Sequence, residues 1–146
     1  MIRKIRKEDK NDYIEMAKSF YMSDAVDHNI PEKHIEDTFD ELMRSDEYAM
    51  AYIMEYEGKT AGYALLAKTF SQEAGGMVLW VEELYVKPEY RCRGLGHEFF
   101  SYLENNLCSG VKRIRLETEE SNKRAISFYK SMGFEYLPYQ QMIKTL

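Results

Sequence analysis

One ten-residue stretch limits the folds open to this chain more than any other feature. It covers residues 77–86 and reads MVLWVEELYV. A strand with one face in water alternates apolar and polar residues, whereas this run is apolar at successive positions. It is also far too short to span a membrane as a helix. The run therefore predicts a central strand in a sheet that is covered on both faces.

Periodicity elsewhere predicts strands and helices around this central strand. Apolar residues at helical spacing predict helices over 10–20, from Pro31 to about residue 43, over 94–107 and after Ser121, a capping residue. Strand-like runs cover 2–6, 47–55, 59–68, 111–117 and 134–144, with a tight turn at Gly58 and a bend or break at Pro138. The predicted order is β-α-α-β-β-β-α-β-α-β. Such an order is typical of an α/β (α+β) fold in which helices cover a mixed sheet.

Length and composition narrow the class of protein. A chain of 146 residues with 45% hydrophobic residues predicts one domain, residues 1–146, with a substantial core. A net charge of -5 argues against a nucleic-acid partner, and no apolar run predicts a membrane span or signal peptide. We therefore expect a cytoplasmic protein. Two cysteines without a Cys/His cluster predict neither a disulfide framework nor a metal site.

The turn after the central strand has the composition of an anion site. Residues 83–97 read ELYVKPEYRCRGLGH and lead into a predicted helix. Gly94 and Gly96 allow a ligand to approach the backbone, where the first helical turn has N–H groups without internal partners. Arg91 and Arg93 add charge-assisted hydrogen bonds, so the segment predicts a diphosphate ligand. It matches neither a Walker A nor a Gly-x-Gly-x-x-Gly pattern. A plain strand-to-helix turn is the alternative.

A second segment gives this turn a family context. Residues 122–134 read NKRAISFYKSMGF, and together with residues 83–97 they resemble the two signature motifs of the GNAT superfamily of acetyl-CoA-dependent N-acetyltransferases. The resemblance covers residues 78–137. It implies a mixed, mostly antiparallel central sheet flanked by helices, and acetyl-CoA as the acetyl donor without a metal. It also implies that the central strand separates from a parallel neighbour at 111–117, leaving a gap for the pantetheine arm.

The resemblance assigns cofactor contacts to individual positions. Leu84 and Val86 match strand positions that pair with pantetheine, and Asn122 matches a polar contact to the pantetheine or its thiol end. Cys92 stands where many relatives have another glycine. The implied cofactor-binding set is Leu84, Tyr85, Val86, Arg91, Cys92, Arg93, Gly94, Leu95, Gly96, His97, Asn122 and Tyr129.

Three residues are candidates for the chemistry. Tyr129 matches the position at which relatives place a tyrosine as general acid, although its helical spacing also fits an apolar stripe. Glu82 and Glu83 interrupt the central strand, and side chains alternate faces along a strand. The resemblance favours Glu82 as a base acting through a water, Glu83 as a substrate contact, and a strand N–H near Leu84 or Tyr85 as the oxyanion donor. Two solvent-exposed or ion-paired glutamates are the alternative.

An acidic segment between residues 24 and 47 bears on the acceptor. Its carboxylates outnumber its two cations, Lys33 and Arg44, to give a local charge of -7. Such a rim would steer a cationic amine; a solvated helix face is the competing interpretation. The nine carboxylates are Asp24, Asp27, Glu32, Glu36, Asp37, Asp40, Glu41, Asp46 and Glu47.

The sequence thus predicts an N-acetyltransferase, monomeric or homodimeric, that moves the acetyl group of acetyl-CoA to a primary amine by direct attack through a tetrahedral intermediate. The acceptor is expected to be a cationic small molecule. Cys92 and Cys108 lack an evident histidine partner, so no covalent enzyme intermediate is expected. The alternatives are a non-catalytic acyl-CoA-binding or sensing module and a protein lysine or N-terminal acetyltransferase.

Overall fold

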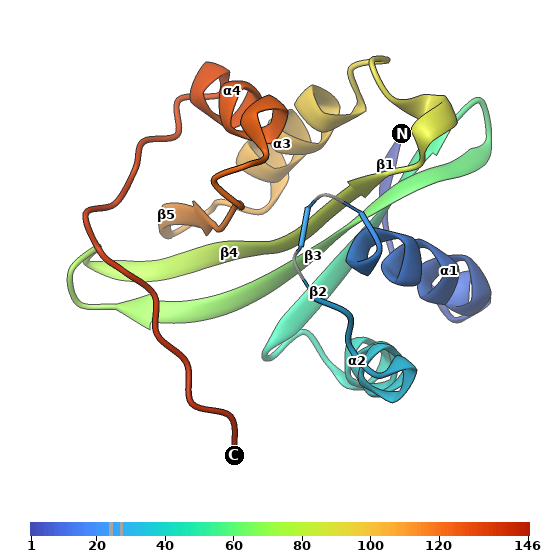
Figure 1. The fold of residues 1–146 in the computed structure, drawn as a ribbon, viewed down its shortest axis with the longest axis horizontal. Coiled ribbons are helices and arrows are strands. Elements are labelled where there is room, and N and C mark those ends of the chain that lie inside the picture. Colours follow the sequence, from blue (N-terminus) through green and yellow to red (C-terminus); the bar gives the residue numbers. More distant parts are fainter. Residues whose placement is uncertain (24, 27) are drawn as a thin grey trace.

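The computed structural model describes residues 1–23, 25–26 and 28–146, and Figure 1 shows their arrangement. Its strands are β1 (Ile2–Lys4), β2 (Ala49–Tyr56), β3 (Lys59–Ser71), β4 (Gly76–Val86) and β5 (Val111–Leu116). Its helices are α1 (Lys10–Tyr21), α2 (Glu32–Arg44), α3 (Leu95–Asn106) and α4 (Lys123–Ser131), with short 3-10 turns at Lys7–Asp9 and Pro88–Tyr90. The predicted order is confirmed as far as α4.

The sheet is mixed and mostly antiparallel, as predicted. Its strands follow the order β1-β2-β3-β4-β5, and only the pairing of β4 with β5 is parallel. β2 and β3 form a hairpin whose two turn residues, Glu57 and Gly58, both adopt positive φ, at 50° and 75°. Two such residues form the tight turn that matches the twist of paired strands.

Helices cover both faces of the sheet. On one face, α1 and α2 pack on β2, β3 and the end of β4, and the predicted α1 stripe of Tyr13, Met16, Ala17 and Phe20 is buried there. On the other face, α3 buries Phe99, Phe100 and Leu103, with α4 packed beside it. Figure 1 shows the two helix pairs on opposite sides of the strands. β4 is thus buried between two cores, as its apolar sequence predicts.

A β-bulge changes the face to which β4 directs its side chains. Val81 pairs with Leu66 and Glu83 pairs with Leu65, which leaves Glu82 as the extra residue. Val81 consequently packs in the core under α3, whereas Glu83 is buried on the side of α1. The parallel pairing with β5 ends at the same place, at Val81 and Leu116, although β4 continues to Val86. The two strands therefore separate after the bulge.

Two sequence predictions near the C-terminus were wrong. The α4 helix is capped by Asn122, whose side-chain oxygen accepts from the N–H of Ala125 at 3.2 Å, and not by Ser121. The predicted strand over residues 134–144 does not form; the chain there has no regular secondary structure and is mostly exposed. Pro138 removes a backbone donor, and a cavity of about 700 Å³ lies between residues 134–141 and β5. A strand needs an adjacent partner, and this cavity separates the segment from the edge of β5.

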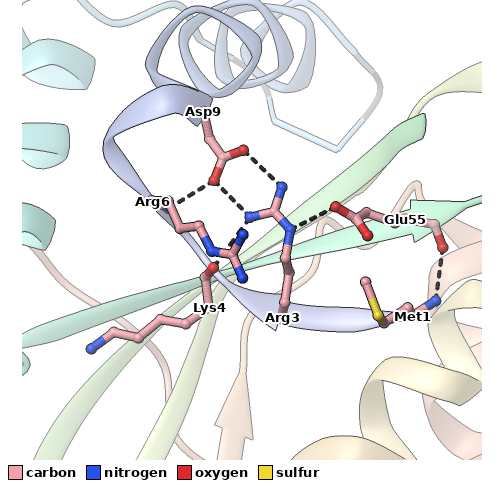
Figure 2. A network of polar contacts seen from close by, with 6 residues as sticks. All are labelled: Met1, Arg3, Lys4, Arg6, Asp9 and Glu55. Carbon is pink, nitrogen blue, oxygen red and sulfur yellow. Dashed lines mark hydrogen bonds and ion pairs between the residues drawn. The ribbon is translucent and has the colours of Figure 1, made fainter. Parts of the chain in front are cut away.

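The first strand is fixed by an ionic network around Arg3, shown in Figure 2. The guanidinium donates from both terminal nitrogens to Asp9, at 2.8 Å each, and from Nε to Glu55 at 2.6 Å. Asp9 also accepts from the backbone N–H of Arg6 at 2.7 Å. The Asp9 side chain is buried, and its hydrogen bonds with Arg3 lower the pKa of its carboxyl group. The network thus joins β1 to β2 and to the start of α1.

We predict that Asp9→Asn lowers the free energy of unfolding by about 3 kcal/mol near neutral pH, because it leaves the Arg3 charge without its main partner. Since folding lowers the pKa of Asp9, its contribution is complete above the unfolded-state pKa and is lost as pH falls through the folded-state pKa. In denaturant unfolding, the difference in the free energy of unfolding between Asp9→Asn and wild type should therefore become smaller as the pH falls. The control is Asp37→Asn, which removes an exposed partner of Lys33. Equal losses in the two variants would contradict a structural role for the network.

Within the described residues, no helix is both long and apolar enough to cross a bilayer.

Candidate active site

A cleft of about 810 Å³ lies where β4 ends and α3 begins. Its walls come from four places: the last residues of β4, the turn into α3, the first turns of α4, and Phe20, Ser23 and Ala25 at and after the end of α1. The cleft therefore begins at the N-terminus of one helix and reaches the segment between the first two helices. Of the predicted cofactor-binding residues, only Arg93 and Tyr129 are absent from its lining.

The N-terminus of α3 has the geometry of an anion site. Gly94 is its N-cap residue in the left-handed region, with φ 80°, and the first helical hydrogen bond runs from the Glu98 N–H to the Gly94 carbonyl at 2.9 Å. The N–H groups of Leu95, Gly96 and His97 precede that bond, so they have no acceptor one turn earlier. All three residues line the cleft. The helix dipole adds partial positive charge at this end.

The end of β4 presents a free backbone edge. The Lys87 N–H donates to the carbonyl of Ala61, in β3, at 2.9 Å. Because backbone groups point to alternate sides along a strand, Leu84 and Val86 face the opposite side, from which β5 has departed. Arg91 already donates from Nε to the Val86 carbonyl at 3.0 Å. The predicted pairing positions therefore lie on the open edge.

The three arginines near the cleft have different positions. Arg91 and Arg124 line it, whereas Arg93 lies over the ring of Tyr56, at 4.9 Å from its centre, and donates to the Tyr56 hydroxyl at 3.2 Å. Arg124 donates to the sulfur of Cys92 at 2.9 Å. Cys92 itself has φ 60°, a left-handed conformation that glycine adopts more easily. Arg93 is thus directed to Tyr56 in this structure, and Arg124 is a cleft cation that the sequence interpretation did not include.

Two predicted contacts have structural roles as well. Asn122 lines the cleft, but its side-chain oxygen caps α4. Gly96 lies within α3, where a Cβ would approach the Phe128 ring to 2.9 Å. Its lack of a side chain therefore permits the packing of α3 against α4, whereas Gly94 permits the turn.

Glu83 is buried and held by two phenols. Tyr21, at the end of α1, donates to one carboxylate oxygen, and Tyr63 of β3 donates to the other, each at 2.5 Å. Burial raises the pKa of Glu83, and the two hydrogen bonds oppose that shift. Burial likewise raises the pKa of Tyr63 well above its usual value. Each carboxylate oxygen of Glu83 thus accepts a hydrogen bond from a phenol. The sequence did not reveal either partner, because Tyr21 and Tyr63 are distant from Glu83 along the chain.

Glu82 has a different environment. Its side chain is exposed at the bulge, immediately after the last β4–β5 pair. Loss of hydration, together with the negative charges of Glu117 and Glu83, raises the pKa of Glu82. Glu117 directly follows Leu116, the last paired residue of β5. Glu82 and Glu117 therefore flank the point at which the strands separate. The pKa of Glu82 is raised above its ordinary value, which suits a general base.

Tyr129 lies on the other side of α4 from the cleft. Its ring packs against Phe100, Phe128 and Phe134, with centres 5.4–6.0 Å apart, and burial raises its pKa to about 12. Tyr129 lines the second cavity, beside β5, together with Glu117. The structure therefore places Tyr129 in an aromatic cluster and does not bring it into the same cavity as the α3 N-terminus.

Most of the acidic segment is engaged in exposed ion pairs. Glu32 pairs with Lys18, Asp40 with Lys10 and Asp46 with Lys4, while three further carboxylates pair within the segment: Asp37 with Lys33, and Glu41 and Glu47 with Arg44. Lysines from other parts of the chain thus offset the local charge. This pattern favours the solvated helix face over the acidic rim. Asp24 and Asp27 lie outside the described residues.

Comparisons with known proteins agree with this geometry. The model of the acetyltransferase (GNAT) family matches residues 10–134, so the chain belongs to that family of acetyl-CoA-using N-acetyltransferases. The Bos taurus thialysine N-epsilon-acetyltransferase is 36% identical over 77 residues, 52% of this chain and 45% of that protein. The Bacillus subtilis spermine/spermidine N(1)-acetyltransferase is 28% identical over 85 residues, 56% of each chain. The chain thus spans about half the length of these relatives.

A solved structure shows the same fold. The aminoglycoside N-acetyltransferase AAC(6′)-Iy in complex with CoA superposes with a TM-score of 0.80 at 16% identity, covering 99% of this chain and 93% of that one. The α+β fold inferred from the sequence is therefore confirmed.

We predict that Gly94→Val weakens coenzyme A binding by at least about tenfold, because a β-branched residue resists the left-handed conformation that forms the turn. Gly110→Val is a matched control, since Gly110 has φ 75°, open space around it and no place in the cleft. Both variants should lose similar stability in thermal unfolding, but only Gly94→Val should lose affinity in calorimetry. Unchanged affinity in Gly94→Val would refute the role of this turn.

Proposed function

We propose that this chain, as a single domain over residues 1–146, transfers the acetyl group of acetyl-CoA to a primary amine of a cationic small molecule. The observation that carries the proposal is the cleft, which joins an anion-binding helix terminus to a free strand edge. Acetyl-CoA requires both, because it has a diphosphate at one end and an amide-containing arm at the other. The residues present fit this co-substrate.

Each part of the co-substrate has a partner in this proposal. The N–H groups of Leu95, Gly96 and His97 hold the diphosphate, with Arg91 adding positive charge. The backbone groups of Leu84 and the N–H of Val86 pair with the pantetheine amides, while the Val86 carbonyl keeps its bond from Arg91. Asn122 lies beside that path, at the start of α4. The co-substrate supplies a thioester, and the chain positions it with its acetyl end toward the separation of β4 and β5.

The carboxylates at this separation act on the amine. Glu82 accepts a proton from the ammonium group through a water, which leaves the amine nucleophilic. Glu83 is fixed by Tyr21 and Tyr63, so it contributes negative charge near the acceptor and contacts it only when a phenol moves away. A backbone N–H at Leu84 or Tyr85 stabilises the oxyanion. Tyr129 is the candidate general acid, which requires its hydroxyl to reach the sulfur from the side of the second cavity.

A cationic acceptor fits the charges and the relatives. Glu82, Glu83 and Glu117 gather where the acetyl group would lie, which favours an ammonium over a neutral or anionic amine. The relatives named above act, by their names, on thialysine, on spermine and spermidine, and on aminoglycosides. All three kinds of acceptor are positively charged amines.

The direct test is a panel of polyamines, lysine analogues and aminoglycosides incubated with acetyl-CoA. Release of free thiol together with an acetyl mass increase on one amine supports the proposal. Tight acetyl-CoA binding with no turnover would instead favour an acyl-CoA-binding or sensing module. Turnover restricted to peptides would favour a protein acetyltransferase.

We predict that Glu82→Gln lowers kcat/KM by about 100-fold, the usual contribution of a general base. Because the pKa of Glu82 is raised, the wild-type rate should fall in acid with a midpoint above the ordinary glutamate value of about 4.3. The variant should lack this limb of the pH profile. The control is Glu120→Gln, an exposed carboxylate outside both cavities. An unaltered pH profile in Glu82→Gln would remove Glu82 from the mechanism.

We also predict that Tyr129→Phe lowers kcat by about tenfold or more with little change in the KM for acetyl-CoA, because the variant keeps the packed ring and removes only the hydroxyl that would donate the proton. Tyr102→Phe on α3 serves as the control. Steady-state kinetics with a saturating amine would check both variants. If kcat survives in Tyr129→Phe, the hydroxyl serves only the aromatic cluster.

A further inference from the structure

We infer that Arg124 is a phosphate-binding residue of the cleft and that Cys92 positions it. The inference rests on the proposed function, because the phosphate belongs to coenzyme A. It adds a residue of α4 to a site otherwise formed by β4 and α3.

The charges around the cleft point to a polyanion. Arg91 and Arg124 both line it, and among the described residues no carboxylate lies within ion-pair distance of either. Elsewhere among the described residues, Arg3, Arg44 and Arg113 each pair with at least one carboxylate, whereas Arg6, Arg93 and Arg115 have no such pair and do not line the cleft. The cleft thus holds two guanidinium groups whose charge is not neutralised by the protein. A guanidinium binds phosphate well because its N–H groups form a planar fork.

The contact with Cys92 sets the direction of Arg124. Arg124 is exposed on the first turn of α4, where a long side chain has many rotamers. One terminal nitrogen donates to the Cys92 sulfur at 2.9 Å, which draws the guanidinium across to the turn before α3. The other N–H groups stay available to a ligand. Arg124 therefore approaches the α3 N-terminus from the opposite side of the cleft.

This contact also accounts for an unusual residue. Cys92 adopts φ 60°, which costs a residue other than glycine about 1 kcal/mol or more. Glycine would relieve that strain but could not contact Arg124. A cysteine at position 92 is thus explained by the contact of its sulfur with Arg124.

Coenzyme A offers two phosphate sources for Arg124, its diphosphate and its ribose 3′-phosphate. Dephospho-CoA retains the first and lacks the second, so the two ligands distinguish the sources. If Arg124 binds the 3′-phosphate, wild type prefers CoA over dephospho-CoA and Arg124→Ala loses that preference. If Arg124 binds the diphosphate, Arg124→Ala lowers the affinities for CoA and for dephospho-CoA equally. Either pattern supports the inference.

The experiment is titration calorimetry of CoA and dephospho-CoA with wild type, Arg124→Ala and Lys123→Ala. Lys123 is the matched control, because it is the preceding exposed cation on α4 and does not line the cleft. We expect Kd for CoA to rise about tenfold in Arg124→Ala, or about 1.4 kcal/mol, and less than twofold in Lys123→Ala. An Arg124→Ala affinity within twofold of wild type would overturn the inference. Absence of CoA binding by wild type would instead overturn the proposed function.

Two further variants test the positioning role. Cys92→Ala and Cys92→Ser keep the same backbone strain, but only serine keeps an acceptor for Arg124. Affinity should fall in Cys92→Ala and recover in Cys92→Ser, and neither change should appear when Arg124 is already alanine. A loss in Cys92→Ala that persists in the Arg124→Ala background would show that Cys92 acts without Arg124.

Discussion

The separation of β4 from β5 is the constraint on which the site depends. The strands are paired up to Val81 and Leu116, and β4 then continues alone to Val86. An unpaired strand edge is unfavourable unless something binds it, because its N–H and C=O groups lose their partners when water is excluded. The bulge at Glu82 accompanies the separation and turns Glu83 toward α1. The bulge and the separation thus fall at the same place, which puts an acidic group beside the free edge.

This geometry places opposite charges at the start of α3 and at the point where β4 and β5 separate. The α3 terminus provides N–H groups and partial positive charge, with Arg91 and Arg124 nearby. Glu82, Glu83 and Glu117 gather where the strands part. On the proposed function, an anionic donor and a cationic acceptor would therefore enter in defined orientations. The same charges that favour each substrate in its own place disfavour the reverse arrangement.

Much of the fold could be predicted from the sequence because local rules determine it. The α1 stripe, the Glu57-Gly58 turn and the apolar run of β4 each follow from residue type and spacing alone. The strand at 134–144 could not be judged in this way, because a strand exists only where a partner edge is adjacent. The bulge at Glu82 was equally hidden, since it is a property of the register between β3 and β4.

The candidate site was predicted less completely, for a similar reason. The turn from β4 into α3 is contiguous in sequence, so its glycines and arginines could be recognised together. The partners of Glu83 are separated from it by 62 and 20 residues, and no local pattern connects Tyr21 or Tyr63 with it. Arg93 and Arg124 also differ in what their side chains contact, Tyr56 in one case and Cys92 in the other. Such choices depend on tertiary contacts.

Backbone amide hydrogen exchange with and without coenzyme A tests the central claim most directly. The account predicts that the ligand slows exchange at Leu84 or Val86 on the open edge of β4 and at Leu95 to His97 in the first turn of α3. Amides of the β2–β3 hairpin should exchange at the same rate in both states. Protection confined to other parts of the chain, with these two segments unchanged, would show that coenzyme A does not bind where β4 leaves β5.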